Sequence, residues 1–258
     1  MENRKFKVAL LQMNITPGDW DKNLEKADEM LTQAAVEKCH LAVLPELWAS
    51  GFDLRSGIRI ISQPPNIVLK NSSSLAIKHG LFLQAGSTIT SAAGRLFNTA
   101  SLFNPEGKIM GRYHKNHLFR MMGETELLQA GQQLCVYDLP WCRAGQTICY
   151  DLRFPELYRK YVRQRCELFF VPAQWPSPRR EHWSTLLRAR AIENQCFVLG
   201  VNRVGTEKNL SFLGASVVIG PDGSVLAEAG ENEELLITEI KMKWLIDLRR
   251  DFPVLEDL

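Results

Sequence analysis

The chain has 258 residues, 45% of them hydrophobic, which suits one large globular α/β domain with a substantial core. Lys and Arg total 31 against 29 Asp and Glu, and the net charge of +2 argues against a basic surface for nucleic acid or anionic lipid. The apolar run Val8–Leu11 is too short for a signal peptide, and no stretch approaches the roughly 18 apolar residues of a membrane helix. We therefore expect a single domain over residues 1–258, cytoplasmic and without membrane or nucleic-acid partners.

Six cysteines are scattered at wide intervals, which favours free thiols in a reducing compartment over a disulfide framework. They form no C-x-x-C pair, and the regular spacing of Cys135, Cys142 and Cys149 matches no known metal site. For any one cysteine, the plain expectation is a small buried apolar residue. A catalytic cysteine therefore has to be identified by its neighbours.

The first half of the chain alternates strands with helices. After the first strand, Asp19 is a good N-cap for a helix whose apolar residues recur at helical spacing. The next apolar run ends abruptly at Pro45-Glu46. The βαβαβ order predicts an α/β layered fold. In chain order, we predict a strand over 6–13, a helix after Asp19, a strand over 40–44, a helix over 67–79 and a strand over 81–88.

The second half repeats the order of the first, and two hairpins accompany the series. The hairpin turns, over 104–107 and 220–223, each combine a proline with a later glycine. We therefore expect two similar halves within one domain, followed by a charged segment over 241–251 that forms a solvated helix or tail. The hairpin strands are predicted over 96–103, 108–113, 215–219 and 224–228, and the second series comprises strands over 144–149, 167–172 and 196–202 and helices over 155–165 and 179–194.

Cys149 stands at the end of a predicted strand and shortly before Phe154-Pro155, where proline suits the first turn of a helix. A thiol at such a junction lies near the edge of the sheet where ligands of open α/β folds bind. The positive end of the following helix should lower its pKa. The segment 150–157 also mixes charged and aromatic residues in a way that a buried strand does not require. Cys149 is therefore the candidate nucleophile.

Two further candidates are weaker when each is judged alone. Glu46 directly follows the apolar sequence Leu-Ala-Val-Leu-Pro, where an edge or capping carboxylate is the simpler explanation. Lys115 follows the strand predicted over 108–113, and a lysine in such a place is ordinarily a solvated surface residue. Local sequence alone does not decide between these explanations and a functional one.

Three segments together resemble the three signatures of the nitrilase, or carbon-nitrogen hydrolase, superfamily. They occur in the order and at the separations typical of that family, and the segments 188–195 and 214–223 resemble later family segments. The resemblance implies a four-layer αββα sandwich with two pseudo-symmetric halves, an inward Glu-Lys-Cys triad and a homodimer. The three signature segments are Leu44-Pro45-Glu46, His114-Lys115-Asn116-His117-Leu118-Phe119 and Ile148-Cys149-Tyr150-Asp151-Leu152-Arg153-Phe154-Pro155-Glu156-Leu157.

The resemblance implies a role for each member of the triad. Glu46 would act as general base while Cys149 attacks an amide carbonyl, forms a thioester and releases ammonia. Lys115 would remain cationic and stabilise the tetrahedral oxyanion together with the backbone N–H of Tyr150. Water would then release the acid.

A fourth site residue follows from the same resemblance. Glu124 precedes Gly131 at the separation of the additional family glutamate. It would hold Lys115 in place or help to protonate the leaving group. Glu126 is close enough in sequence to be the alternative for this role.

Three segments, 117–120, 149–155 and 175–179 with the following His182-Trp183, are most similar to the omega-amidase branch of the superfamily. That branch hydrolyses the terminal amide of short 2-oxo dicarboxylic monoamides such as 2-oxoglutaramate and 2-oxosuccinamate. Because these substrates carry a carboxylate, Arg153 is the first candidate for binding it and Arg120 the second. Arg153 has an alternative role, bracing its turn by pairing with Asp151 or Glu156, and Trp175 either walls the pocket or packs in the core.

Other functions stay open or are disfavoured. Other branches with the same triad act on deaminated glutathione, N-carbamoyl amines or nitriles, and these remain alternatives. A papain-like hydrolase would recruit one of three histidines but leave Glu46 and Lys115 unexplained. A binding module without catalysis would have a broken triad, and nucleic-acid binding through the arginines of 179–190 would need a wider basic surface. The three histidines are His114, His117 and His182.

No cofactor is expected, because the sequence has neither a G-x-G-x-x-G motif nor a P-loop. His114 and His117 form an i, i+3 pair without a further carboxylate or cysteine cluster, so no metal is expected either. The expected partner is a small-molecule amide substrate.

Overall fold

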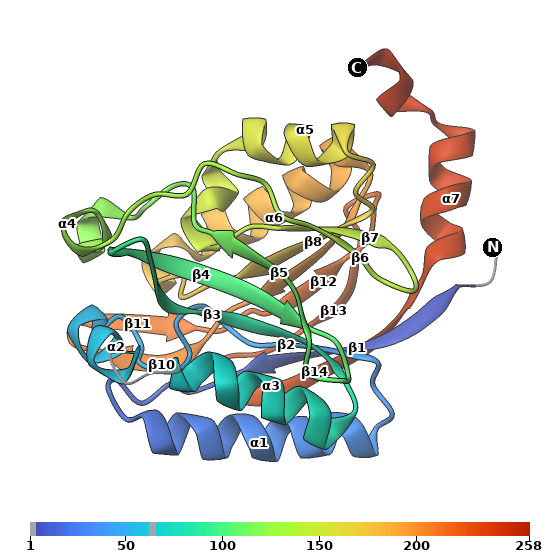
Figure 1. Ribbon diagram of the computed structural model, residues 1–258. Coiled ribbons are helices and arrows are strands. Elements are labelled where there is room, and N and C mark those ends of the chain that lie inside the picture. Colours follow the sequence, from blue (N-terminus) through green and yellow to red (C-terminus); the bar gives the residue numbers. More distant parts are fainter. Residues whose placement is uncertain (1–3, 62–65) are drawn as a thin grey trace.

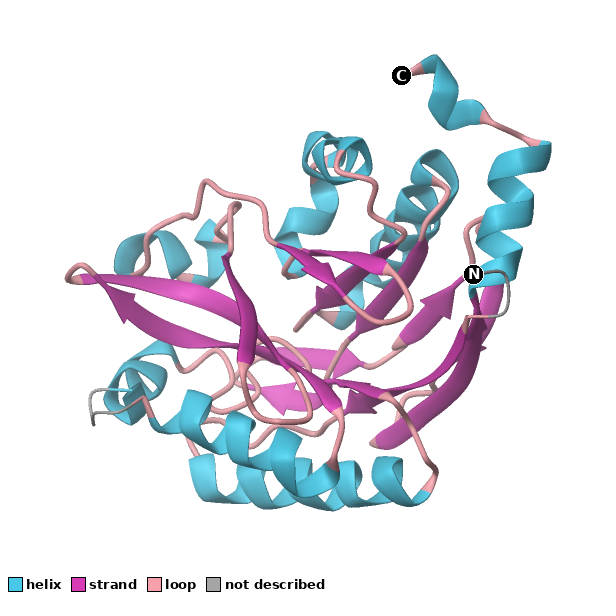
Figure 2. Ribbon diagram, turned by 45° about the vertical axis from the view of Figure 1, so that its right-hand side comes forward, coloured by secondary structure: helices cyan, strands magenta, loops and turns pink. Residues whose placement is uncertain are grey.

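The computed structural model describes residues 4–61 and 66–258, and within these ranges the chain forms two six-stranded sheets that pack face to face (Figure 1). Helices cover the outer face of each sheet, so the layers follow the order helix, sheet, sheet, helix (Figure 2). The expected four-layer αββα sandwich is confirmed. None of the helices in these ranges is long and apolar enough to cross a membrane.

The first sheet has three parallel strands at its centre and antiparallel strands on both sides. In spatial order it contains β14 (Glu234–Lys241), β1 (Lys5–Gln12), β2 (Leu41–Val43), β3 (Phe82–Ala92), β4 (Arg95–Phe103) and β5 (Ile109–His114). The helices α1 (Trp20–Val36) and α3 (Ile67–His79) connect its parallel strands and pack on its outer face.

The second sheet has the same plan. Its parallel centre is β7, β8 and β9, an antiparallel strand precedes the first of these, and an antiparallel hairpin follows the last. This correspondence confirms the expectation of two similar halves. In spatial order the sheet contains β13 (Val225–Glu228), β12 (Val217–Ile219), β9 (Phe197–Val201), β8 (Leu168–Pro172), β7 (Arg143–Gln146) and β6 (Val136–Asp138), and the helices α5 (Pro155–Arg163) and α6 (Arg180–Asn194) cover it.

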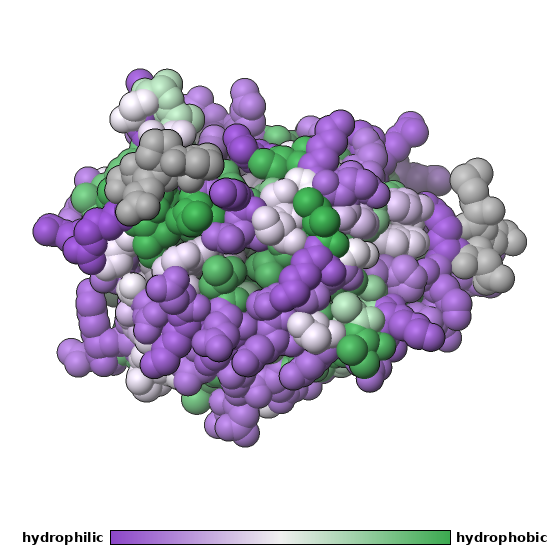
Figure 3. All heavy atoms as spheres, turned by 60° about the horizontal axis from the view of Figure 1, so that its bottom comes forward, coloured by the Kyte–Doolittle hydropathy of each residue, from purple (hydrophilic) through white to green (hydrophobic). Residues whose placement is uncertain are grey.

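Strand β1 shows that both faces of the first sheet are buried. Val8 and Leu10 point into the core between the sheets, whereas Ala9 and Leu11 point into the core under the helices. A strand buried on both faces is a continuous apolar run, as the sequence predicts here. The opposite surface of α1 and α3 is largely hydrophilic (Figure 3).

Local signals set the ends of the helices, and two of these signals, Asp19 and Pro155, are predicted from the sequence. Asp19 caps α1 by accepting a hydrogen bond from the backbone N–H of Lys22 at 3.1 Å. Helix α3 ends at Gly80, whose φ of 62° lies in the left-handed region that glycine adopts without strain. Pro155 occupies the first turn of α5.

Several elements lie where the sequence predicts no element. The most important is β14, which pairs antiparallel with β1 along its whole length and so ties the end of the chain to its beginning. The helix α7 (Met242–Asp251) follows it and buries Met242 and Leu245, so the charged C-terminal segment is a partly packed helix. Further unpredicted elements are α2 (Leu54–Ile61), α4 (Glu124–Leu127), β6, β10 (Val204–Glu207), β11 (Leu210–Leu213) and the 3-10 turns η1 (Arg120–Met122), η2 (Cys149–Arg153), η3 (Ser177–Arg179) and η4 (Val254–Asp257).

Candidate active site

Three separate segments bring Glu46, Lys115 and Cys149 together. Glu46 lies in the turn after β2, Lys115 directly follows β5, and Cys149 begins η2 shortly after β7. The strands β2 and β5 belong to one sheet and β7 to the other, so the site lies where the carboxyl ends of strands from both sheets meet. All three side chains are buried.

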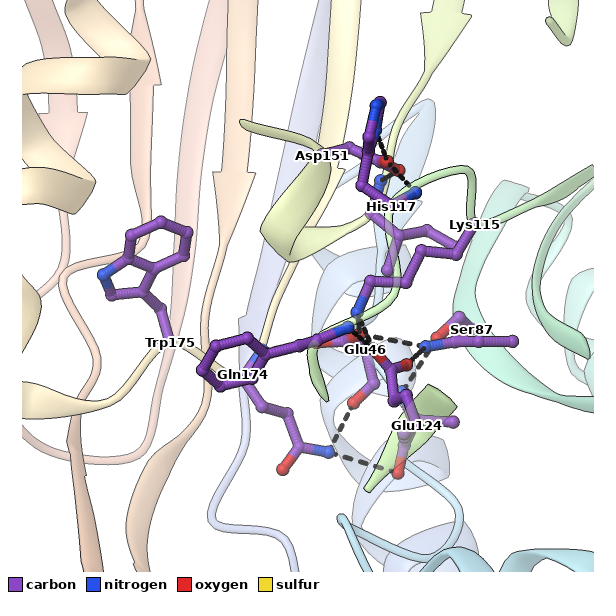
Figure 4. Close-up of polar contacts among 12 residues, drawn as sticks. Glu46, Ser87, Lys115, His117, Glu124, Asp151, Gln174 and Trp175 are labelled. Atoms are coloured by element: carbon purple, nitrogen blue, oxygen red, sulfur yellow. Dashed lines mark hydrogen bonds and ion pairs between the residues drawn. The ribbon is translucent and has the colours of Figure 1, made fainter. Parts of the chain in front are cut away.

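Lys115 lies between two carboxylates (Figure 4). Its Nζ donates to Glu46 Oε1 and to Glu124 Oε2, each at 2.7 Å, and all three side chains are 0% exposed. The Asn98 amide donates to the same two carboxylates at 2.9 and 2.8 Å. The structure therefore places Glu124 in contact with Lys115, whereas Glu126 is exposed.

These buried charges shift one another's pKa values. Burial raises the pKa of Glu46, and the charge of Glu124 raises it further, while Lys115 acts in the opposite direction. Burial acts to lower the pKa of Lys115, but the charges of Glu124 and Glu46 outweigh it and raise that pKa. Lys115 therefore stays cationic, and Glu46 is more readily protonated than an exposed glutamate.

The pKa of Cys149 is shifted in the direction opposite to the one that the sequence predicts. Burial and the adjacent charge of Glu46 raise it well above the usual value of a thiol, whereas the sequence predicts a lowered value. The reason is distance and solvation, because η2 separates Cys149 from the N-terminus of α5 and the thiol is only 6% exposed. Cys149 lies beside Glu46, so the resting thiol holds its proton next to a carboxylate that can accept it.

Cys149 also has an unusual backbone conformation. Its φ is 44°, in the left-handed region that few residues other than glycine adopt. Backbone strain of this kind is concentrated at functional sites. The predicted strand over 144–149 ends earlier, at Gln146, because the chain turns sharply to present the thiol. All six cysteines are free.

Arg153 lies against two aromatic rings at the other end of η2. Its guanidinium carbon is 4.8 Å from the centre of the Trp175 ring and 5.9 Å from that of Tyr150. Its Nη2 is 3.2 Å from His182 Nδ1. The structure thus brings Arg153, Tyr150 and Trp175 together, and it leaves Arg120 exposed on η1.

The structure gives Asp151 hydrogen-bond partners other than Arg153. Asp151 is fully buried, and its oxygens accept hydrogen bonds from the backbone N–H groups of His117 and Ile148 and from the Tyr113 hydroxyl. Asp151 thereby ties the segment that carries Lys115 to the segment that carries Cys149. Glu156 is exposed on α5, and the described residues show no ion pair between it and Arg153.

Comparisons with known proteins agree with this geometry. The carbon-nitrogen hydrolase family profile matches residues 7–250. The chain belongs to the carbon-nitrogen hydrolase family. The 2-oxoglutaramate amidase of Bacillus subtilis is 36% identical to it and the human omega-amidase NIT2 is 31% identical, with 98% and 96% of this chain and 98% and 93% of those proteins covered.

Solved structures give the same assignment. A carbon-nitrogen hydrolase superfamily protein of Xanthomonas campestris, solved with an arsenic adduct in its active site, superposes with a TM-score of 0.91 and 31% identity over 98% of this chain and 97% of that one. The nitrilase superfamily protein Nit3 of Saccharomyces cerevisiae gives a TM-score of 0.89 with 29% identity over 97% and 95%. The expected superfamily is confirmed, and the protein is a hydrolase of carbon–nitrogen bonds other than peptide bonds.

The histidines of this hydrolase have other partners than the candidate nucleophile. His114 stacks on Phe97 and lies 2.8 Å from Thr99 Oγ1, and His117 stacks on Phe154. Nothing in these contacts supports a papain-like pair. Within the described ranges, no group of three or more His, Cys, Asp or Glu side chains is arranged to hold a metal ion.

Three residues around the site were not predicted as site residues from the sequence. Asn98, Asp151 and Gln174 are buried polar residues that hydrogen-bond to the candidate carboxylates or to their loops. Gln174 and Asp151 each lie just past the carboxyl end of a parallel strand, where ligand sites of α/β sheets gather. That position is a usable signal for both, whereas Asn98 lies within β4 and carries no local signal.

Proposed function

We propose that Glu46, Lys115 and Cys149 form the catalytic triad of an omega-amidase. The reaction is the hydrolysis of 2-oxoglutaramate or 2-oxosuccinamate to the 2-oxo acid and ammonia. The observation that carries this proposal is the buried cluster in which Lys115 joins Glu46 to Glu124 at 2.7 Å and Cys149 lies beside Glu46. The relatives named as 2-oxoglutaramate amidase and omega-amidase support the choice of substrate.

In the first half of the reaction, the proton of the Cys149 thiol passes to Glu46 while sulfur bonds to the amide carbon. Charge develops on the former carbonyl oxygen. The Lys115 ammonium and the backbone N–H of Tyr150 stabilise this oxyanion, each by about 3 kcal/mol. Because Glu46 begins as a carboxylate with a raised pKa, it is a stronger base than an exposed glutamate.

The first half-reaction ends when protonated Glu46 returns its proton to the nitrogen. The carbon–nitrogen bond then breaks, ammonia leaves and the thioester remains. In the second half-reaction, Glu46 removes a proton from water while the water oxygen bonds to the thioester carbon. As the carbon–sulfur bond breaks, the acid is released and Glu46 returns the proton to the sulfur of Cys149. Glu124 keeps the ammonium of Lys115 in place and balances its charge throughout. One carboxylate thus serves both half-reactions.

Arg153 is the proposed ligand of the substrate's distal carboxylate. Its stacking on Trp175 and Tyr150 orients the guanidinium and leaves its planar fork suited to a carboxylate. Arg153→Lys should raise KM for 2-oxoglutaramate by about tenfold, because an ammonium provides no bidentate fork. Steady-state kinetics measure this, and Arg120→Lys, at the exposed second candidate, is the matched control. An unchanged KM in the Arg153 variant would assign Arg153 to structure.

Ammonia release from a substrate panel tests the proposed function. The panel holds 2-oxoglutaramate, 2-oxosuccinamate, deaminated glutathione, N-carbamoylputrescine and a simple nitrile, and the Cys149→Ala protein is the blank. We expect the highest kcat/KM with one of the two 2-oxo monoamides. A preference for the glutathione derivative, the carbamoyl amine or the nitrile would reject the substrate and leave the triad in place.

We also propose that the protein is a cytoplasmic homodimer. The family resemblance supports the dimer, and the six free cysteines support a reducing compartment. Sedimentation velocity should show a single species of twice the chain mass, and a monomer at micromolar concentration would contradict the dimer.

A further inference from the structure

Gln174 holds the turn that carries Glu46 (Figure 4). It follows Ala173, which is the first residue after β8. The backbone N–H of Gln174 donates to Glu46 Oε2 at 3.1 Å, and its side-chain Nε2 donates to the Glu46 carbonyl at 2.7 Å. Gln174 therefore holds both the carboxylate and the backbone of one residue. The next residue, Leu47, has a φ of 45°, so this contact fixes a turn whose backbone is strained.

A buried arginine determines which way the Gln174 amide faces. Arg203 is 0% exposed, and its Nη1 donates to Gln174 Oε1 at 2.9 Å. Because a guanidinium has only donors, it accepts no contact from the amide nitrogen and keeps the amide oxygen on its own side. The amide nitrogen must then face Glu46. Arg203 is held in turn by the carbonyl of Ile15 at 2.6 Å.

Glu207, the ion-pair partner of Arg203, holds the other end of the same turn. Glu207 Oε2 accepts from Arg203 Nη1 at 2.7 Å and from the backbone N–H of Phe52 at 3.2 Å. Its carboxylate lies so close to Gly51 that a Cβ there would come within 2.7 Å of Glu207 Oε2. One buried ion pair therefore fixes the turn from 46 to 52 at both ends, and it does so from outside the catalytic cluster.

We propose that Gln174 and Arg203 are positioning residues that hold the Glu46 carboxylate against Lys115 and Cys149. The two side chains act through Glu46, because Arg203 orients the Gln174 amide and that amide holds the Glu46 backbone. This inference rests on the proposed role of Glu46 as general base. It accounts for a buried Arg203–Glu207 ion pair that the proposed mechanism does not otherwise use.

The proposal predicts a change in pH dependence. The ionisable groups that face Glu46 are Lys115, Glu124 and Cys149, and a variant of Gln174 leaves all three in place. The Gln174 N–H bonds to the charged form of Glu46 and so favours it. When this N–H is no longer held, the pKa of Glu46 should rise further. The base is then protonated over more of the pH range, and the acid limb of kcat/KM moves to higher pH.

Gln174→Met tests this, because methionine has a similar length and no charge, donor or acceptor of comparable strength. We expect kcat to fall roughly tenfold or more, KM to stay within about twofold, and the acid limb to move up by about half a pH unit. The double variant Arg203→Met/Glu207→Gln removes the ion pair without leaving one charge alone, and it should shift the limb in the same direction.

Arg249→Met is the control for a purely structural effect. Arg249 also donates to backbone carbonyls, those of Cys166 and Gln195, but at the C-terminal end of the molecule. It should lower Tm and leave the acid limb unchanged. A loss of folded protein that is equal at every pH lowers the profile without moving its limb, so the limb is read over the pH range in which thermal unfolding shows each variant to be folded. An unshifted limb in both site variants would overturn the inference, whereas activity in Glu46→Gln would overturn the proposed function itself.

Discussion

Replacing Cys149 with alanine should lower kcat for amide hydrolysis by a factor on the order of 10⁴ or more, because without the sulfur no thioester can form. The remaining oxyanion donors have no covalent intermediate to stabilise. Tm should change little, since the substitution removes one small buried atom and leaves the ion pairs of Lys115 intact. Ammonia release and thermal unfolding measure the two effects.

A second buried cysteine provides the matched control for this variant. Cys142 is 3% exposed and lies in the core between the sheets, away from Glu46 and Lys115. Cys142→Ala makes the same change in a different place and should leave kcat within about twofold. If Cys149→Ala retained activity within tenfold of the original protein, or if both variants lost activity equally, the assignment of the nucleophile would be wrong.

The fold was largely predictable because its elements carry strong local signals. The parallel strands are continuous apolar runs, and Asp19, Pro155 and Gly80 mark helix ends by side-chain capping, fixed φ and left-handed φ. β14 escaped prediction for a physical reason. It is only half-buried on most of its length and is held by pairing with β1, a partner more than two hundred residues away. Pairing at that distance leaves no local trace.

The candidate site was predictable in composition and not in electrostatics. Glu46 and Lys115 look like solvated residues in isolation, and only the tertiary fold buries them and makes each the partner of the other. The pKa of Cys149 depends on that burial, so a rule based on the following helix gives the wrong sign. The positioning roles of Arg203 and Gln174 are unpredictable for the same reason, although the place of Gln174 just past β8 marks it as a possible site residue. Their roles arise from contacts between segments that are far apart in sequence.

Lys115→Met should both inactivate and destabilise the protein. Methionine matches the length of lysine but leaves the carboxylates of Glu46 and Glu124 buried together without a cation. Breaking a buried ion pair from one side costs roughly 3–5 kcal/mol of unfolding free energy. Loss of the ammonium also removes an oxyanion donor and should lower kcat by at least about 10²-fold. Chemical denaturation and ammonia release measure these effects.

The destabilisation should depend on pH with a definite sign. In the original protein the folded-state pKa of Lys115 is raised, so its stabilising contribution is fully present below the usual lysine pKa and is lost only in strong alkali. In the variant the pKa of Glu46, already raised by burial, should rise further because the opposing charge of Lys115 is gone. Carboxyls shifted upwards stabilise the fold when protonated and destabilise it as pH rises through the folded pKa. The loss of stability should therefore be larger at pH 8 than at pH 5.

A double variant separates charge from packing. Adding Glu124→Gln to Lys115→Met removes one of the two facing carboxylates, so it should restore part of the lost stability at pH 8 and none of the activity. Lys243→Met is the surface control, because the pair of Lys243 with Asp247 is exposed and screened by solvent, so its loss should change stability little. A Lys115→Met protein that unfolds like the original at pH 8 would show that the buried carboxylates do not depend on this cation. The ammonium would then have to be assigned to the oxyanion alone.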